Sequence, residues 1–424
     1  MDRKIYDGYV AILKHELVPA MGCTEPIAVA YAAAKARDIL GRFPDHVVAY
    51  LSGNIIKNVK GVTVPNSGDQ RGIEVAVVLG CVGGKSELKL EVIKDVTEEH
   101  IAKTRELVQA GFCEARLVEG KDNLYIRIEM TAGDQSALVL VEKEHTNITR
   151  IEKNGEVLYC AETSKANADG EIIDKSLLNI HDIIEFANEL NVDDLRFELQ
   201  RQIDMNTAIS AEGMNNKWGA EVGKELMRMF GDSADGRAAA RAAAGSDARM
   251  GGCSMPVVIN SGSGNQGMTI ALPVHEFATA WHKDQDTMLR ALALADLVAV
   301  HIKRHIGNLS AFCGAVSAGC AAACGVAYMD GCTEAQIGML ITNALCNVGG
   351  IVCDGAKSSC AAKIASAVHA SLLAYHMSCH GRCFLDGEGL VGDGIEKTIQ
   401  NIGRMGKEVM KSTDVEILNI MIGN

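Results

Sequence analysis

The spacing of apolar and polar residues changes twice along the chain. Residues 4–17 carry apolar side chains at helical spacing, and Pro19 and Gly22 end that pattern. A second helix is predicted to follow directly, with Thr24 as its N-cap and Pro26 in its first turn. Cys23 would then lie immediately before a helix N-terminus.

Between residues 46 and 159 the pattern becomes that of strands. One helix, expected from Thr97 to Gly111, interrupts it, and the pair Asn154–Gly155 predicts a late hairpin turn. The polar, glycine-rich stretch 53–68 is expected to be a solvated hairpin, with a place beside a site as the second interpretation. The predicted strands are residues 46–52, 74–80, 88–93, 114–119, 124–130 and 137–143.

After residue 165 the pattern is helical to the C-terminus. The pattern along the whole chain therefore predicts an α+β protein. It would have a large all-helical catalytic domain (171–424) and an inserted strand-rich α+β domain (45–170). The N-terminal helices (1–44) are expected to pack on the helical domain. That packing would bring Cys23 close to the cysteine-rich part of the helical domain.

Composition and charge limit the classes of partner and the location that the chain could have. Apolar residues make up 48% of the chain but aromatic residues only 4%, so the core is expected to consist of small side chains. The net charge is −13 without a basic stripe, which argues against nucleic acid or an anionic membrane as a partner. The least polar run, 309–329, is expected to be a buried helix, and the N-terminus has no signal-peptide pattern. A cytoplasmic protein with reduced thiols is therefore expected.

Three features could carry chemistry. A thiol at Cys23, before a helix N-terminus, would have a lowered pKa; the alternative is a small residue in a turn. The stretch 260–267, N-S-G-S-G-N-Q-G, precedes a helix and could bind a carboxylate or phosphate through backbone N–H groups, or be a flexible turn. Nine of the fourteen cysteines lie between Cys313 and Cys383, without a C-x-x-C pair. Spacing alone leaves a metal cluster and ordinary buried thiols both open.

Five stretches in combination resemble one family. They are H-E-L-V-P-A-M-G-C-T-E-P-I-A-V-A-Y-A-A-A (15–34), S-G-N-I-I-K-N-V (52–59), N-S-G-S-G-N-Q-G-M (260–268), C-G-A (313–315) and G-I-V-C-D-G-A-K-S-S-C (350–360). The chain resembles the L-cysteine desulfidases and their UPF0597 relatives, which are similar to the α-part of iron–sulfur L-serine dehydratases. The resemblance implies a [4Fe–4S] cluster held by Cys313, Cys353 and Cys360, with Cys23 as general base.

The activity that this implies is α,β-elimination of a small amino acid, with L-cysteine giving pyruvate, ammonia and sulfide. Cysteine is favoured because a soft iron–sulfur site suits a sulfur leaving group. The alternatives are an L-serine dehydratase, a PLP-dependent lyase on an α/β scaffold, and a non-enzymatic iron–sulfur sensor; a homo-oligomeric state is left open. The residues expected to hold the substrate or balance its charge are Ser261, Ser263, Asn265, Gln266 and Lys357.

Overall fold

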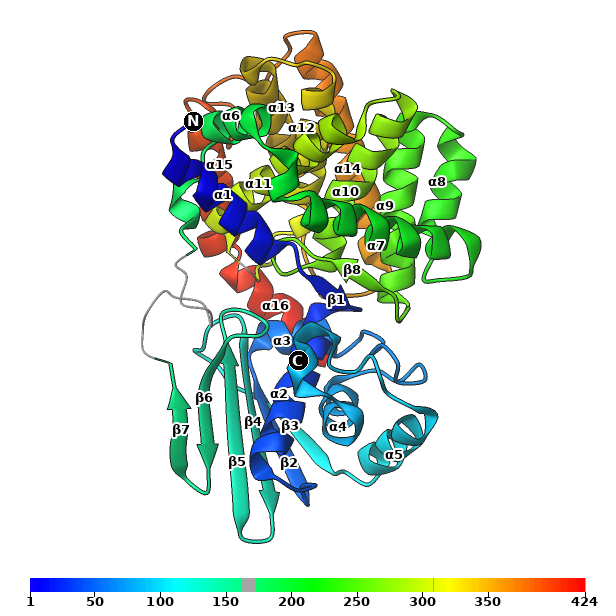
Figure 1. Cartoon of the computed structure of the whole chain (residues 1–424), viewed down its shortest axis with the longest axis vertical. Helices are drawn as coiled ribbons and strands as arrows, with labels where there is room; N and C mark the ends of the chain where they lie inside the picture. Colours follow the sequence, from blue (N-terminus) through cyan, green and yellow to red (C-terminus); the bar gives the residue numbers. More distant parts are fainter. Residues whose placement is uncertain (162–172, 308, 424) are drawn as a thin grey trace.

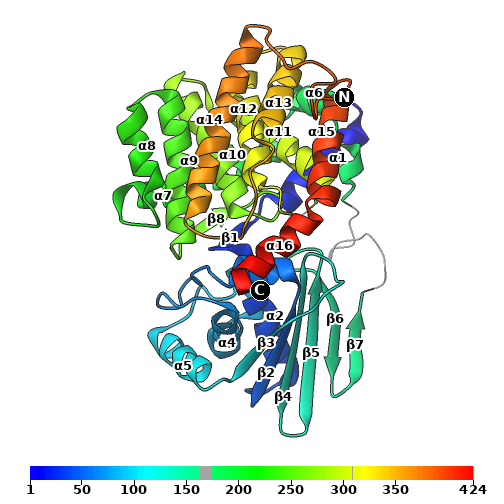
Figure 2. The ribbon, with the colours of Figure 1, turned by 180° about the vertical axis from the view of Figure 1, so that it is seen from behind.

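The computed structural model describes residues 1–161, 173–307 and 309–423 and confirms the α+β class (Figure 1). A mixed six-stranded sheet with its helices forms one unit, and a larger assembly of helices forms the other. The view from behind shows the same two units, with the C-terminal helix reaching from the helical unit to the sheet unit (Figure 2). The predicted boundary between residues 170 and 171 lies outside the described residues.

The sheet has the strand order β3-β2-β4-β5-β6-β7, in which only β2 and β3 pair in parallel. Buried and less buried residues alternate along β4 and β5, as expected for a sheet with one covered face. Asn154 and Gly155 both have positive φ, which confirms the predicted hairpin turn between β6 and β7. The strands are β2 (His46–Leu51), β3 (Cys113–Leu117), β4 (Tyr125–Ala132), β5 (Gln135–Glu142), β6 (Ile148–Lys153) and β7 (Glu156–Cys160).

Two of the predicted strands are wrong. Residues 74–80 belong to helix α4 (Ile73–Gly83), and residues 88–93 begin in the 3-10 helix η1 (Ser86–Glu91). Helix α4 packs so closely on α2 (Thr24–Leu40) that a Cβ on Gly80 would lie 2.3 Å from the carbonyl oxygen of Ala30. A helix buried on nearly all sides has a continuous apolar run, which the sequence pattern cannot distinguish from a buried strand.

Two further predictions in this unit are tested by the structure. The stretch 53–68 is no hairpin, because it contains helix α3 (Gly53–Val59), whose side chains are largely buried. Helix α5 (Glu98–Gln109) has the predicted start, with a capping box between Thr97 and His100. Helices α2, α4 and α5 form the layer that packs against the sheet through contacts of α2 with β4 and β5.

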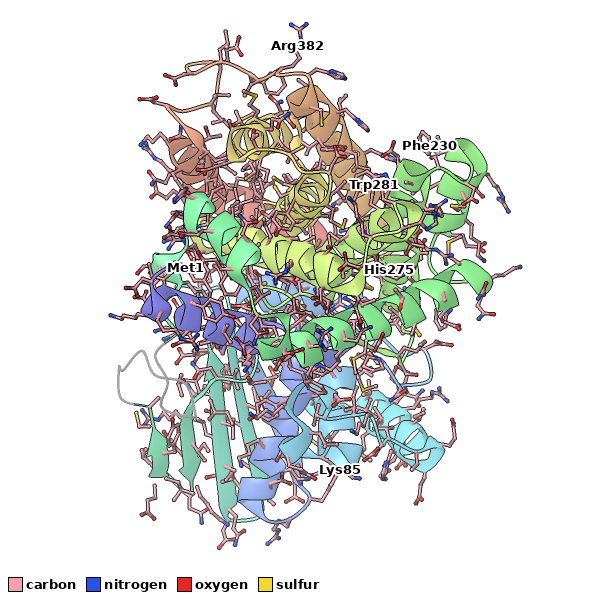
Figure 3. The ribbon with its side chains drawn as sticks, turned by 45° about the horizontal axis from the view of Figure 1, so that its top comes forward. Met1, Lys85, Phe230, His275, Trp281 and Arg382 are labelled. Atoms are coloured by element: carbon pink, nitrogen blue, oxygen red, sulfur yellow. The ribbon has the colours of Figure 1, made fainter. Side chains whose placement is uncertain are left out.

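The helical unit is built around small residues. A Cβ on Gly319 of α12 would lie 2.9 Å from the backbone of Ala367 in α14, so these two helices approach closely. Figure 3 labels Trp281 in the helical unit and Lys85 in the sheet unit. The few aromatic residues of the helical unit include Phe277 and Phe312, which are buried in its core. The helices are α1 (Arg3–Glu16), α6 (Ile180–Glu189), α7 (Arg196–Asn215), α8 (Val222–Phe230), α9 (Ala234–Met250), α10 (Gly264–Ala280), α11 (Gln285–Ile306), α12 (Gly314–Met329), α13 (Glu334–Val348), α14 (Ser359–Cys379), α15 (Ile395–Arg404) and α16 (Lys411–Ile422).

The N-terminal helices separate between the two units. Helix α1 packs in the helical unit, where Tyr6 and Tyr9 contact Phe186. Helix α2 instead packs on the sheet, so the expectation that both helices pack on the helical domain is corrected for α2. Its buried face is rich in alanine, which allows the close approach of α4 at Gly80.

Several contacts connect the units, and two of them involve pairs of secondary-structure elements. Strand β1 (Pro19–Met21), between α1 and α2, pairs antiparallel with β8 (Pro256–Val258), which follows α9. Helix α16 packs on α3 of the sheet unit. Among the helices of the described residues, none is long and apolar enough to cross a membrane, and most of residues 309–329 form the buried helix α12.

Candidate active site

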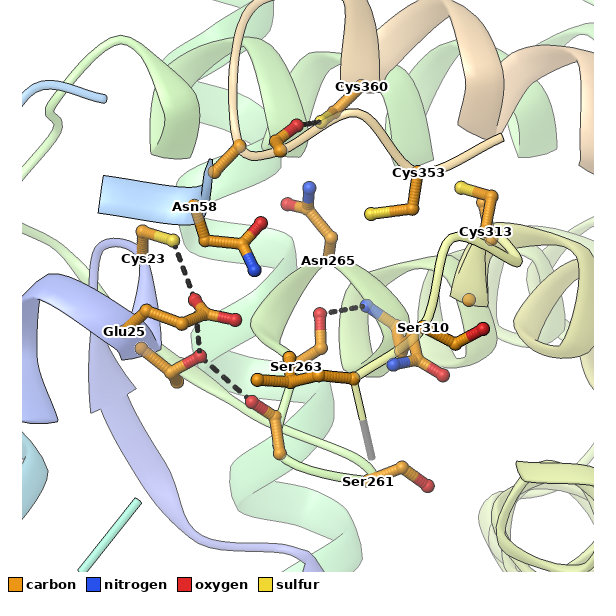
Figure 4. Close-up of a pocket in the computed structure, with 18 of the residues that line it drawn as sticks. Cys23, Glu25, Asn58, Ser261, Ser263, Asn265, Ser310, Cys313, Cys353 and Cys360 are labelled. Atoms are coloured by element: carbon orange, nitrogen blue, oxygen red, sulfur yellow. Dashed lines mark hydrogen bonds between the residues drawn. The ribbon is translucent and has the colours of Figure 1, made fainter. Parts of the chain in front are cut away.

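A cavity of about 110 Å³ lies where the two units meet (Figure 4). Helix α2 of the sheet unit contributes Cys23 at its start, and helices α10, α12 and α14 of the helical unit contribute their N-terminal ends. Eight of the nine residues singled out from the sequence line this one cavity. They are Cys23, Ser261, Ser263, Asn265, Gln266, Cys313, Cys353 and Cys360.

Cys313 and Cys353 are held side by side by backbone hydrogen bonds. The N–H of Cys313 donates to the carbonyl of Ile351 over 3.1 Å, and the N–H of Cys353 donates to the carbonyl of Ala311 over 2.6 Å. These bonds flank the isolated antiparallel bridge between Phe312 and Val352. The loop before α14 is therefore fixed against the loop before α12.

Cys360 completes the thiol-lined wall from the first turn of α14. Its thiol lies 3.6 Å from the carbonyl oxygen of Gly355, in the loop that also carries Cys353. Gly355 has φ +94°, and a Cβ there would lie 2.4 Å from the carbonyl oxygen of Lys57, so the loop can pass α3 only with glycine at this position. Burial raises the pKa of the Cys313 thiol to about 12, and burial also raises the pKa of the Cys360 thiol.

Positive charges surround this wall. Lys303 is buried, burial lowers the pKa of its ammonium group to about 8, and within the described residues the ammonium has no hydrogen-bond or ion-pair partner. Lys57 donates a 3.1 Å hydrogen bond to the Cys353 carbonyl, and Lys363 donates a 2.9 Å hydrogen bond to the Val352 carbonyl. Three thiolates close together are stable only with such charges or a bound cation.

This wall fits an iron–sulfur cluster with three thiolate ligands. The donors are sulfur atoms only, they come from three rigidly held positions, and the buried ammonium of Lys303 would offset the negative charge of the thiolates. Cys313, Cys353 and Cys360 would hold the cluster. With three protein ligands, a fourth iron would keep an open coordination position.

Cys23 forms the opposite wall with Glu25. The thiol of Cys23 donates a 2.9 Å hydrogen bond to Oε2 of Glu25, and the Thr24 hydroxyl lies 3.2 Å from the same oxygen. Nε2 of His145 lies 3.9 Å from Oε1 of Glu25. Cys23, rather than the predicted Thr24, is the N-cap of α2.

The predicted low pKa of Cys23 is wrong. Burial raises the pKa of this thiol well above its ordinary value, and the charge of Glu25 raises it further. The helix N-terminus and Arg249 act in the opposite direction but do not compensate. For Glu25, burial alone would raise the pKa, but the interaction with His145, whose Nε2 lies 3.9 Å away, and the hydrogen bond from Cys23 outweigh it and lower the pKa to about 2. The resting pair is therefore a neutral thiol beside an ionised carboxylate.

The glycine-rich stretch 260–267 places the N-terminus of α10 at the cavity. Ser263 is the N-cap, and its hydroxyl accepts from the N–H of Gln266. Ser261 has φ +50°, and its backbone N–H donates a 2.9 Å hydrogen bond to Glu16. This N–H is therefore not available to bind a substrate. Oε1 of Gln266 is buried without a hydrogen-bond partner among the described residues.

Arg249, at the end of α9, is a site residue that no sequence motif indicated. Its guanidinium group is buried, and burial lowers the pKa of the group. It donates a 3.1 Å hydrogen bond to Oδ1 of Asn265, while its Nε has no hydrogen-bond partner among the described residues. A buried guanidinium group beside a helix N-terminus is a strong site for a carboxylate.

Two other residues of this cavity were not singled out individually from the sequence. His145 lies in the connection between β5 and β6, and the lack of a side chain on Gly262 lets it approach, since a Cβ there would lie 3.0 Å from the His145 ring. Asn58 of α3 also lines the cavity, in agreement with the second interpretation of stretch 53–68. Both belong to elements whose positions only the tertiary fold determines.

Lys357 is the exception among the predicted residues. Its ammonium group forms a 2.7 Å ion pair with Asp354, and it does not line the cavity. The expected role in holding the substrate is therefore corrected, whereas the expected role in balancing charge stays a prediction. Lys357 and Lys363 contribute to the electrostatics of Cys360, and Lys303 to those of Cys313 and Cys353.

Comparisons with known proteins show which sequences this chain is similar to. Residues 87–419 match the family described as serine dehydratase alpha chain. A UPF0597 protein of Lachnoclostridium phytofermentans is 48% identical over 99% of this chain and 100% of its own length. The chain belongs to the UPF0597 family. A second UPF0597 relative, from Desulfitobacterium hafniense, is 46% identical over 99% of this chain and 97% of its own length. The predicted resemblance is thereby confirmed.

Proposed function

We propose that this UPF0597 protein is a lyase that catalyses α,β-elimination from a small amino acid, with L-cysteine as the favoured substrate. The products from L-cysteine would be pyruvate, ammonia and sulfide. The observation that carries the proposal is the opposition of Cys23 and Glu25 to three thiols across one small cavity. The match to the serine dehydratase alpha chain supports elimination chemistry in general.

The substrate carboxylate would bind at the N-terminus of α10. Arg249 supplies a buried positive charge there, and the backbone N–H groups of the first turn supply hydrogen-bond donors. Gln266 and Asn265 flank this position and would fix the orientation of the carboxylate. The size of the cavity limits the ligand to a molecule with few non-hydrogen atoms.

The ammonium group of the substrate would bind to Glu25. This carboxylate is ionised and buried, and so it is a strong site for a cation. An ammonium group beside Glu25 would compete for the oxygen that now accepts from Cys23, and its positive charge would lower the pKa of the thiol. Substrate binding would thus produce the thiolate that the resting site disfavours.

Cys23 would then take the proton from the α-carbon. The electron pair of the broken C–H bond forms the α,β double bond, and the β-substituent leaves with its bonding pair. When bound, an iron–sulfur cluster on Cys313, Cys353 and Cys360 would supply a Lewis acid for the leaving β-substituent. The aminoacrylate product tautomerises to an imine, which water hydrolyses to pyruvate and ammonia.

The other interpretations make different predictions about the same cavity. A serine dehydratase would use the same residues with a hydroxyl as the leaving group. A PLP enzyme of the type considered would have an α/β scaffold, whereas this chain is α+β. A non-enzymatic iron–sulfur sensor would have no need of Cys23, Glu25 and Arg249 opposite the thiols.

The decisive experiment uses protein purified without oxygen. Iron and acid-labile sulfide are measured, and pyruvate release is followed with L-cysteine and with L-serine. We expect an iron–sulfur absorption spectrum and faster turnover of L-cysteine. Full lyase activity in iron-free protein would refute the cluster, and turnover of L-serine alone would make the protein a dehydratase.

The role of Cys23 is tested by Cys23→Ala. Loss of a general base lowers kcat by a factor of about 10²–10⁴, while the iron content and spectrum stay unchanged. Cys81→Ala is the matched control, because Cys81 is a buried thiol of α4 that does not line the cavity. If Cys23→Ala also lost the cluster, the thiol would be a ligand and the proposed base would be wrong.

A further inference from the structure

Helices α12 and α14 lie side by side and run in the same direction. Both begin at the cavity, where they carry Cys313 and Cys360, and they are in contact midway at Gly319 and Ala367. At 1.5 Å per residue, the 16 residues of α12 span about 24 Å. Their C-terminal ends therefore lie far from the candidate active site.

A second group of ligand atoms lies at these far ends. Asp330 is the C-cap of α12, Cys332 follows it after a turn at Gly331, and Cys379 is the last residue of α14. One carboxylate oxygen and the two sulfur atoms all lie within 4.8 Å of one another. Both thiols are partly buried and Asp330 is exposed, so solvent reaches the group.

The distance between the two sulfur atoms is that of a metal site. They are 3.9 Å apart. A tetrahedral ion with metal–sulfur bonds of about 2.3 Å separates two sulfur ligands by about 3.8 Å. A disulfide has a sulfur–sulfur distance of about 2 Å, so the two thiols are not joined by one.

Charge and orientation also favour a cation at this position. The C-terminal ends of two parallel helices concentrate partial negative charge, which attracts a positive ion. The hydroxyl of Tyr375 donates a 2.7 Å hydrogen bond to Oδ2 of Asp330. Such an outer hydrogen bond commonly orients a carboxylate ligand.

We propose that Asp330, Cys332 and Cys379 form a binding site for a borderline-soft divalent cation of the Zn²⁺ type. Two thiolates and one carboxylate are a donor set that Zn²⁺ accepts, and water would occupy the fourth position. The ion would join the C-terminal end of α12 to that of α14. Since the N-terminal ends of the same helices carry Cys313 and Cys360, the ion would also fix the spacing of the candidate active site.

The test measures cation binding to the full-length protein. Wild type and Cys332→Ser are purified in parallel under reducing, oxygen-free conditions and titrated with Co²⁺, whose thiolate charge-transfer band reports sulfur ligation. Zn²⁺ is then added in competition. Because the cysteines of the cavity are the same in both proteins, any metal bound there cancels in the difference.

We expect wild type to bind one more equivalent of metal than Cys332→Ser, and Cys379→Ser to behave like Cys332→Ser. Tyr375→Phe should weaken Zn²⁺ binding by a factor of about 10, as expected for an outer-shell partner. Cys383→Ser is the matched control, because Cys383 is another partly exposed thiol of this region outside the group. It should bind metal like wild type.

Two results would overturn the proposal. One is equal metal content and equal Co²⁺ spectra in wild type and both serine variants. The other is a disulfide between Cys332 and Cys379 in the protein as isolated, detected by mass spectrometry of alkylated peptides, that reduction does not convert into a metal-binding form. A rise in melting temperature with Zn²⁺, seen in wild type but absent from Cys332→Ser, would support the proposed joining of the helices.

Discussion

The ion pair between Lys57 and Asp414 connects the C-terminal helix to the candidate active site. Lys57 lies on α3 with its side chain 1% exposed, and Asp414 lies on α16 with its side chain 12% exposed. The same ammonium group donates a hydrogen bond to the carbonyl of Cys353. Asp414→Asn would leave the Lys57 charge buried without its counter-ion.

The cost of that change follows from the burial of the pair. Removing one partner of a buried ion pair destabilises a protein by about 3–5 kcal/mol. Asparagine can still accept a hydrogen bond and Asp414 keeps some solvent contact, so we expect the lower limit, about 3 kcal/mol. For a unit of this size, that corresponds to a decrease in melting temperature of about 6–12 °C.

The assay is thermal and urea unfolding of the full-length protein. Asp386→Asn is the control, because Asp386 is an exposed aspartate whose change should stay within about 0.5 kcal/mol. The double variant Lys57→Met with Asp414→Leu should recover all but about 1 kcal/mol, the value of the hydrogen bond lost at the Cys353 carbonyl. A loss below 1 kcal/mol in Asp414→Asn, or no recovery in the double variant, would refute the reasoning.

Three further substitutions test the candidate active site and the helix packing around it. Because the pKa of Glu25 is lowered from 4.5 to about 2, its ionisation stabilises the fold above about pH 5, and this stabilisation disappears as the pH falls to about 2. As the pH falls from about 5 to about 2, the free energy of unfolding of the wild type should decrease by about 3 kcal/mol because of Glu25, and this contribution should be absent from Glu25→Gln. Gly267→Ala puts a Cβ 2.1 Å from the Val258 carbonyl oxygen and should lower the melting temperature, whereas Gly338→Ala, with no atom nearer than 3.9 Å, should not. Arg249→Met should raise KM for the amino acid about 10–100-fold with circular dichroism unchanged; an unchanged KM would place the carboxylate elsewhere.

The cysteines of the thiol-lined wall and the glycine-rich stretch 260–267 could be predicted as site residues, because the signals that indicate them lie within short segments of sequence. Cysteine spacing, glycine content and a helix start are visible in a few neighbouring residues, as at Ser263 and Gln266. The run 74–80 was not predictable in this way, since a helix buried on all sides and a buried strand give the same apolar pattern. The direction of the Cys23 pKa was missed for a related reason. The helix N-terminus is local, but the burial that outweighs it comes from residues of both units.

The position of the site between the units explains which residues the sequence could not indicate. His145 approaches from the sheet unit and Arg249 from the helical unit, and they meet where β1 pairs with β8. That ladder runs between the end of α1 and the start of α2, so it places Cys23 opposite the thiols of α12 and α14. Helix α16 contacts α3 on the same side as Cys353. The buried core of the sheet unit also includes Ile209, Met268 and Leu272 of the helical unit, so the contacts between the units hold the proposed base opposite the thiols. A displacement of one unit would therefore disturb this shared core as well as the geometry of the site.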